Sequence, residues 1–181
     1  MATTIQLRDY QRDALTAIAD AEARGQRRIL AALPTGCGKT ILFVEHILRR
    51  LPRRALVLVH RDELLQQAAE KFRQIAPGAH LGIVKAEQDG HTARVVLASV
   101  QTLSRANRLQ RLATDFRTIV IDEAHHAAAD SYRAILKHVG AFQPHGPLVL
   151  GVTATPYRAD GIGLVVPTCL RGSSTSAGCW K

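Results

Sequence analysis

The chain has 181 residues, which is enough for one sizeable globular domain and too few for two α/β domains of the usual size. Hydrophobic residues make up 46% of the sequence, and no apolar run approaches the ~18 residues of a membrane span, which argues against a membrane protein. The net charge of +9, from 24 Lys and Arg against 15 Asp and Glu, favours a polyanionic partner such as nucleic acid, although a generally Arg-rich proteome would also explain it.

The N-terminus carries no basic start followed by an apolar stretch, so the sequence gives no sign of secretion. Three cysteines, Cys37, Cys169 and Cys179, form no CxxC pair, which argues against a disulfide framework and a zinc site. A cytoplasmic location with free thiols is expected.

Short apolar runs alternate with longer segments of helical spacing along most of the chain. A first helix is expected at Leu7–Ala23, before the first strand. The expected strands are Arg28–Leu33, Ala55–His60, Leu81–Lys85, Arg94–Ser99, Thr118–Asp122 and Leu148–Thr153. Crossover helices are expected at Lys39–Arg50, Asp62–Ile75 and Asp130–Val139. Because these strands are almost entirely apolar, the pattern predicts an α/β fold, a mostly parallel sheet with helices on both faces.

The character of the sequence changes at Leu164. Residues 164–181 have no periodicity and are rich in Ser, Thr and Gly. We therefore expect one domain over residues 1–163, followed by a disordered or non-native tail.

A glycine-containing segment lies between the first expected strand and the next helix, with the sequence Leu33-Pro34-Thr35-Gly36-Cys37-Gly38-Lys39-Thr40. Its glycines allow a tight turn whose N–H groups face phosphate oxygens, next to the positive end of a helix. Lys39 would reach the β- and γ-phosphates and Thr40 would ligate Mg²⁺. The general phosphate-loop pattern has Gly where this chain has Leu33, and a chance Gly-Lys-Thr after a strand is the alternative.

Two adjacent carboxylates, Asp122 and Glu123, follow another apolar strand. In a parallel sheet, ligands gather at the carboxyl ends of the strands, so these residues should lie beside the phosphate loop. Asp122 would hold Mg²⁺ and Glu123 would orient and partly deprotonate the water that attacks the γ-phosphate. The alternative is an acidic pair that caps a helix.

These segments resemble the motifs of superfamily 2 helicases of the DEAH-box kind. The resemblance rests on Pro34–Thr40 as motif I, Asp122-Glu123-Ala124-His125 as motif II and Thr153-Ala154-Thr155-Pro156 as motif III. Segments at both ends resemble a narrower branch, that of the type III restriction subunit, XPB-like and RadD-like proteins: Leu7-Arg8-Asp9-Tyr10-Gln11 and Thr155-Pro156-Tyr157-Arg158-Ala159-Asp160-Gly161. The resemblance covers about residues 5–163 and implies a first RecA-like P-loop NTPase domain.

The resemblance also implies roles for single residues. Gln11 would read the adenine edge with its amide, and Arg8 would lie near the base or its phosphates. An ordinary exposed helix residue is the alternative for Gln11. Thr153 and Thr155 would couple the nucleotide state to the grip on nucleic acid, with His125 as hydrogen-bonding partner. ATP contacts would thus come from Arg8, Gln11, Thr35, Gly36, Cys37, Gly38, Lys39, Thr40, Asp122 and His125.

Nucleic-acid contacts are expected on two further segments, Val59–Leu64 and Ala98–Leu103, which resemble motifs Ia and Ib. Each joins a strand end to a helix start, where N–H groups, hydroxyls and Arg can hold phosphates without reading bases. The candidate contacts are Arg61, Ser99, Gln101 and Thr102. For Arg61 the alternative is a solvated surface charge.

The full-length parent is therefore expected to be an ATP-driven helicase or translocase that acts on DNA rather than RNA. No second RecA-like domain is recognisable after Gly163, and that domain supplies the arginine fingers in this superfamily. We expect this chain to bind ATP and Mg²⁺ with little hydrolysis. A P-loop phosphotransferase and a non-catalytic nucleic-acid-binding module are the alternatives.

Overall fold

The computed structural model describes residues 6–154, 168–171 and 174–177. They form one nine-stranded sheet with the order β4-β3-β5-β2-β6-β7-β1-β8-β9. The strands are β1 (Arg28–Ala32), β2 (Ala55–Val59), β3 (Leu81–Lys85), β4 (Gln88–Asp89), β5 (Val95–Ser99), β6 (Thr118–Asp122), β7 (Leu148–Thr153), β8 (Thr168–Arg171) and β9 (Ser174–Ala177). All neighbouring strands pair in parallel except for the antiparallel pairs β3·β4 and β8·β9.

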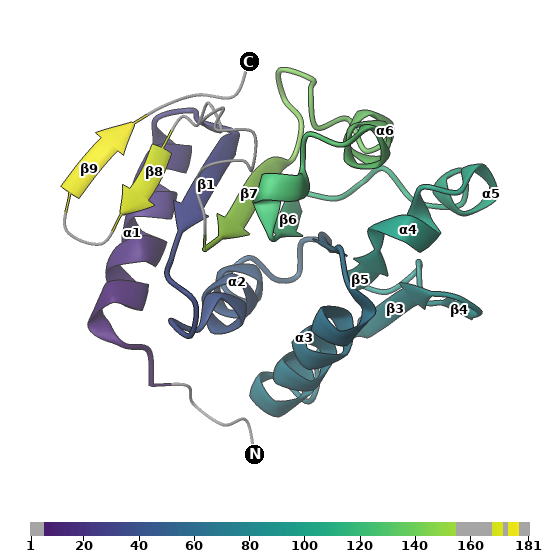
Figure 1. The fold of residues 1–181 in the computed structure, drawn as a ribbon, viewed down its shortest axis with the longest axis horizontal. Coiled ribbons are helices and arrows are strands. Elements are labelled where there is room, and N and C mark those ends of the chain that lie inside the picture. Colours follow the sequence, from purple (N-terminus) through teal and green to yellow (C-terminus); the bar gives the residue numbers. More distant parts are fainter. Residues whose placement is uncertain (1–5, 155–167, 172–173, 178–181) are drawn as a thin grey trace.

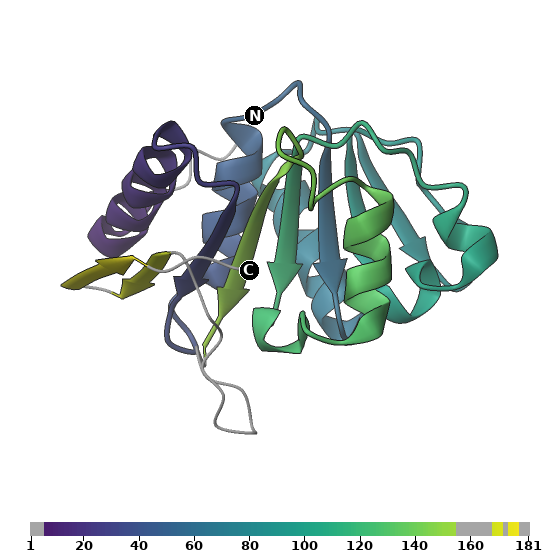
Figure 2. The same cartoon turned by 90° about the horizontal axis from the view of Figure 1, so that it is seen from above.

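The helices cover both faces of this sheet, as Figures 1 and 2 show. They are α1 (Asp9–Ala23), α2 (Lys39–Leu48), α3 (Asp62–Ile75), α4 (Val100–Leu103), α5 (Ala106–Leu109), the 3₁₀ turn η1 (Ala124–His126) and α6 (Asp130–His138). Among these helices, none has the length and apolar character needed to cross a membrane. The predicted α/β fold with a mostly parallel, doubly covered sheet is confirmed.

The alternation of side chains along the strands builds a separate core on each face. On one face, strand residues such as Ile29 and Val57 pack with buried residues of α1, α2 and α3. On the other, their neighbours Leu30 and Leu56 pack with α4 and α6. Because both sets are buried, each strand is apolar throughout, which is why the sequence showed continuous apolar runs.

The expected elements are present with small differences at their ends. The helix expected from Leu7 begins at Asp9, and the helices expected to end at Arg50 and Val139 end at Leu48 and His138. The short elements β4, α4, α5 and η1 were not predicted, because two to four residues are too few to show a hydrophobic period.

Two strands, β8 and β9, lie in the segment for which no regular structure was expected. β8 pairs with the open edge of β1 and β9 pairs with β8. Backbone pairing at a sheet edge needs no apolar period, so the composition of residues 164–181 did not reveal it.

Gly151 in β7 sets how closely the segment after β6 approaches the sheet. A Cβ atom at this position would lie 2.8 Å from Ala124 Cβ and 2.9 Å from Leu30 Cδ1, so neither neighbour could stay in place. Ala124 follows Asp122 and Glu123 directly, and Gly151 therefore permits the position of the two carboxylates.

We expect Gly151→Ala to destabilise the domain by about 1–3 kcal/mol, since it overpacks a site with no room for a methyl group. Urea unfolding measures this loss. Gly78→Ala is the matched control, because a Cβ there meets nothing within 4 Å. Equal stabilities of the two variants would contradict the steric argument.

Candidate nucleotide site

The phosphate loop connects the end of β1 to the first turn of α2. Gly36 and Gly38 have φ angles of 81° and 68°, the left-handed region that glycine occupies without strain. Lys39 and Thr40 are half-buried in the first turn of α2, while Thr35 and Gly36 are exposed. This is the arrangement of an anion-binding helix N-terminus.

Leu33, the one departure from the general loop pattern, continues the strand. Its N–H donates to the carbonyl of Thr153 at 2.9 Å, and its side chain is buried with 5% exposed. The position is therefore used for packing, and the turn is made by the glycines that follow.

The start of α1 is tied to the phosphate loop. Gln11 Nε2 donates to the Cys37 carbonyl at 3.2 Å, and Tyr10 donates its hydroxyl to the same oxygen at 3.1 Å. Gln11 Oε1 accepts from the backbone N–H of Arg8 at 3.0 Å. Gln11 is only 3% exposed, so it is not the ordinary exposed helix residue of the alternative reading. The sequence motifs assigned no role to Tyr10. Only its position next to Gln11 could have indicated that it contacts the loop.

Gly38 also leaves the space that Gln11 needs. A Cβ atom on Gly38 would lie 2.7 Å from Gln11 Nε2 and would push the amide away from the loop. The position of the Gln11 amide therefore depends on a glycine at position 38 of the loop.

Asp122 and Glu123 lie at the carboxyl end of β6. Because β7 stands between β6 and β1, this end is close to the phosphate loop. The Glu123 N–H donates to Asp122 Oδ1 at 3.0 Å, and Glu123 has a φ of 51°, which turns the chain sharply after the strand.

Burial raises the pKa of Asp122 to about 6, and the charge of Glu123 acts in the same direction. The Glu123 N–H and the Lys39 ammonium oppose this rise, which places Lys39 within electrostatic reach of Asp122. The two carboxylates carry more negative charge than the Lys39 ammonium neutralises, so a divalent cation would balance the charge beside the anion-binding loop. The oxygen ligands present, Thr40 and Asp122, are those that Mg²⁺ prefers, so the residues fit Mg²⁺ with a phosphate ligand.

His125 joins this carboxylate pair to β7. Its Nδ1 lies 3.1 Å from Thr153 Oγ1 and 3.3 Å from Glu123 Oε2. Thr153, at the end of β7, is fully buried. The expected contact between His125 and the threonine is present in this arrangement, whereas Thr155 lies outside the described residues.

A stack of histidines extends from the carboxylates to the end of β2. The His125 and His126 rings are 4.1 Å apart, and the His126 and His60 rings stack at 4.4 Å. Burial lowers the pKa of both His60 and His126, and neighbouring positive charges add to this effect. His60 immediately precedes Arg61, so the stack connects motif II to motif Ia. This contact between distant segments had no sequence signal.

Tyr132 on α6 packs under the same carboxylates. Burial and the charges of Asp122 and Glu123 raise the pKa of its phenol, which keeps it neutral. The hydroxyl is buried and has no hydrogen-bonding partner among the described residues.

The proposed nucleic-acid residues differ in exposure. Arg61 and Gln101 are exposed, at the starts of α3 and α4. Ser99 is 1% exposed and Thr102 is 7% exposed. Thr102 Oγ1 accepts from the Ala86 N–H at 3.3 Å, so in this structure its hydroxyl holds the loop after β3.

A phosphate loop after β1 and paired carboxylates after β6, on a doubly covered parallel sheet, define the first RecA-like domain of a superfamily 2 helicase. Residues 4–158 match the family described as the type III restriction enzyme, res subunit. The chain belongs to this family, which confirms the branch that the sequence motifs indicated.

Two curated relatives match over most of the chain. The sequence is 40% identical over 167 residues to irc3 of Schizosaccharomyces pombe, a candidate mitochondrial ATP-dependent helicase, covering 88% of this chain and 28% of that protein. It is 39% identical over 168 residues to IRC3 of Saccharomyces cerevisiae, a candidate ATP-dependent helicase, covering 85% and 24% respectively. The chain therefore spans about a quarter of the length of these relatives.

Solved structures share the fold. The Hef helicase domain of Pyrococcus furiosus superposes with a TM-score of 0.69 at 29% identity, covering 83% of this chain and 33% of that one. The SWI2/SNF2 ATPase core of Sulfolobus solfataricus, solved with double-stranded DNA, gives a TM-score of 0.64 at 20% identity, covering 84% and 32%. The second likeness concerns the fold alone.

We expect the burial of Asp122 to make the ligand-free domain less stable as the pH rises. The folded-state pKa is raised, so the stabilising effect of the bound proton is complete at low pH and is lost as the pH passes about 6. Between about pH 5 and pH 7 this loss should be about 1 kcal/mol, and Asp122→Asn should remove it. Urea unfolding with EDTA present measures both proteins. If the free energy of unfolding of Asp122→Asn changed with pH as much as that of the wild type, the raised pKa assigned to Asp122 would be wrong.

Proposed function

We propose that this chain is the ATP-binding domain of an ATP-dependent helicase or translocase. The observation that carries the proposal is the convergence of the phosphate loop and Lys39 with the buried Asp122 and its neighbour Glu123. A P-loop with a paired carboxylate site binds nucleoside triphosphate and activates water against it. Both named curated relatives are described as ATP-dependent helicases, which supports the same reading.

In this proposal each residue has one role. Lys39 binds the β- and γ-phosphate oxygens, together with the N–H groups of the loop and the first turn of α2. Thr40 and Asp122 hold Mg²⁺, which when bound neutralises charge on the phosphate oxygens. Glu123 accepts a proton from the attacking water as general base.

The Gln11 amide is proposed to form hydrogen bonds with the edge of the adenine base. Its contact with the Cys37 carbonyl uses one N–H of Nε2, and its contact with Arg8 uses one lone pair of Oε1. The amide keeps a second donor and a second acceptor, which is the pair that the adenine edge requires. Binding of the base would thus be transmitted to the loop through one side chain.

The route from nucleotide to nucleic acid is proposed to run through His125 and the histidine stack. Glu123 and Thr153 both contact His125, and His126 connects this group to His60 beside Arg61. We propose that the phosphate backbone, of DNA rather than RNA, is bound by Arg61, Ser99, Gln101 and Thr102. Thr102 would have to release the Ala86 N–H to take part.

Strong hydrolysis is proposed to require parts of the parent beyond this chain, namely a second RecA-like domain with an arginine finger. Such an arginine is worth about 10³–10⁵ in turnover. The chain alone is therefore proposed to bind ATP and Mg²⁺ with little hydrolysis. A cytoplasmic location is also only proposed, and the S. pombe relative is named as mitochondrial.

Two other functions use the same loop. A P-loop phosphotransferase would need an acceptor pocket beside the phosphates, and a non-catalytic nucleic-acid-binding module would have no use for Glu123. The position of Glu123 next to the buried Asp122, in contact with His125, favours the helicase-type ATPase over both.

Lys39→Ala should weaken binding of ATP and Mg²⁺ at least tenfold, because it removes the ammonium from the phosphates. Isothermal titration calorimetry measures the affinity. Lys137→Ala, which removes an exposed ammonium from α6, should bind like the wild type. Unchanged affinity in a folded Lys39→Ala protein would mean that ATP binds elsewhere.

Glu123→Gln should keep the affinity for ATP and Mg²⁺ and lower turnover at least a hundredfold, because the amide cannot accept a proton from water. Turnover is best measured in the full-length parent, where it is high enough to follow by phosphate release. A variant that turns over at the wild-type rate would exclude Glu123 as the base.

A further inference from the structure

A row of arginines lies at the end of the sheet opposite to the nucleotide site. Segments that lead into the strands carry a run of arginines, and five of them have no ion-pair partner within residues 6–154: Arg24, Arg28, Arg53, Arg94 and Arg117. We call these five residues the arginine edge. Two acids on this edge are already paired, since Glu22 contacts Arg27 and Arg50, and Asp115 contacts Arg54.

The carboxyl end of the sheet is different. There, Lys85 pairs with Asp62, and Arg108 and Arg111 both pair with Asp89. These three basic side chains are therefore neutralised, while others on that side, Arg61 among them, have no ion-pair partner within residues 6–154.

The sheet fixes the spacing of the arginine edge. Arg94, Arg53 and Arg117 precede β5, β2 and β6, which are consecutive in the sheet, and Arg28 starts β1 two strands further along. Backbone hydrogen bonds from Ala55 to Arg94 and from Arg117 to Arg54 hold the first three strand starts in one row. Four strand spacings span about 19 Å, which is long enough for several phosphates of one nucleic-acid strand.

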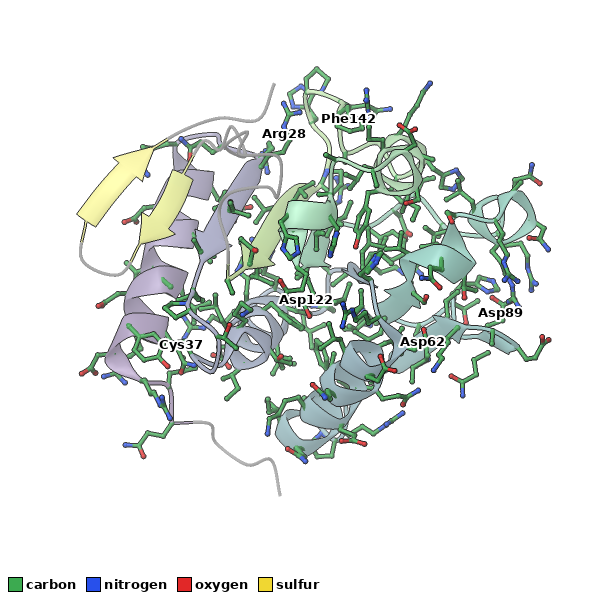
Figure 3. All side chains as sticks on the ribbon, in the orientation of Figure 1. Arg28, Cys37, Asp62, Asp89, Asp122 and Phe142 are labelled. Atoms are coloured by element: carbon green, nitrogen blue, oxygen red, sulfur yellow. The ribbon has the colours of Figure 1, made fainter. Side chains whose placement is uncertain are left out.

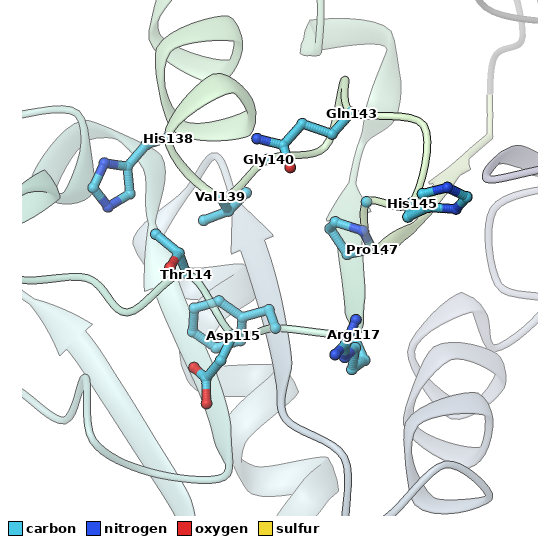
Figure 4. Close-up of a pocket in the computed structure, with 11 residues that line it drawn as sticks. Thr114, Asp115, Arg117, His138, Val139, Gly140, Gln143, His145 and Pro147 are labelled. Atoms are coloured by element: carbon cyan, nitrogen blue, oxygen red, sulfur yellow. The ribbon is translucent and has the colours of Figure 1, made fainter.

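An aromatic side chain and a cavity lie on the same edge. Phe142 is the one large hydrophobic residue that is exposed in the described part of the chain, with 52% of its surface exposed. It stands in the turn before β7, and Figure 3 shows it far from Cys37. Beside it, a polar cavity of about 320 Å³ is bordered by Arg117, Gln143 and His145, as Figure 4 shows.

We propose that the arginine edge, Phe142 and this cavity bind single-stranded nucleic acid, as a second surface separate from motifs Ia and Ib. Guanidinium groups hold the phosphates without reading sequence, and the exposed Phe142 ring offers a face on which an unpaired base stacks. A duplex has its bases already stacked and gains nothing from Phe142, so the surface selects single strands. The inference does not rest on ATP binding at Lys39.

The test is fluorescence anisotropy with labelled oligothymidylate and oligouridylate of about twelve nucleotides, long enough to cross the whole edge, at about 50 and about 200 mM salt. Arg117→Gln should weaken binding and lower the slope of log affinity against log salt by about 0.7, the value for one phosphate contact to a single strand. Phe142→Ala should weaken binding about fivefold without changing that slope, and Phe142→Tyr should bind like the wild type. The two oligonucleotides distinguish DNA from RNA as the source of the strand.

Arg133→Gln is the matched control, because it removes an exposed arginine on α6 that has no ion-pair partner among the described residues. It should leave affinity unchanged, and ATP binding should be unchanged in all four variants. Equal losses in Arg133→Gln and Arg117→Gln would overturn the proposal, since only total charge would then matter. It would also be overturned if Arg61→Gln abolished binding while Arg117→Gln and Phe142→Ala did not weaken it, an outcome that leaves the proposed function intact. Failure of ATP binding with normal oligonucleotide binding would overturn only the proposed function.

Discussion

The parallel pairing of β7 between β1 and β6 is the constraint on which the nucleotide site depends. It brings the ends of two strands that are separated by most of the domain in sequence to one edge of the sheet. Pairing continues past β1 through the Leu33 N–H and the Thr153 carbonyl, so the phosphate loop starts from a fixed backbone. Thr153 in turn contacts His125, and through it the carboxylate pair. One strand therefore positions both halves of the site.

The site is held under electrostatic strain that a ligand can relieve. Asp122 is buried beside Glu123, and the raised pKa of Asp122 reflects how unfavourable its negative charge is at this position. Under the proposed function, Mg²⁺ held by Thr40 and Asp122 would offset this cost. Asn in place of Asp122 would also remove the cost but would take away the carboxylate ligand, so stability and the proposed function oppose each other at this residue.

The two ends of the sheet have different electrostatic characters. At the carboxyl end, Lys85, Arg108 and Arg111 are paired with acids, while five arginines at the amino end have no ion-pair partner within residues 6–154. This division supports the two proposals made above, a triphosphate at the carboxyl end and a phosphate backbone at the amino end, because positive charge attracts each polyanion.

The sequence by itself determined the strands, the crossover helices and the two motifs, because buried strands are apolar throughout and a phosphate loop needs glycines before Lys39. The expected roles of Lys39, Thr40, Asp122 and Glu123 follow from residue types that few other chemistries combine. The tertiary structure alone decided the contacts between distant segments. Gln11 donates a hydrogen bond to the Cys37 carbonyl, and the His60 ring stacks on His126. The Thr102 hydroxyl accepts a hydrogen bond from the loop after β3, and β8 pairs with β1. It also decided that arginines far apart in the sequence form a row at the amino end of the sheet. The physical reason is that periodicity records which side chains are buried, whereas partners across the sheet depend on strand order, and strand order leaves no local mark in the sequence.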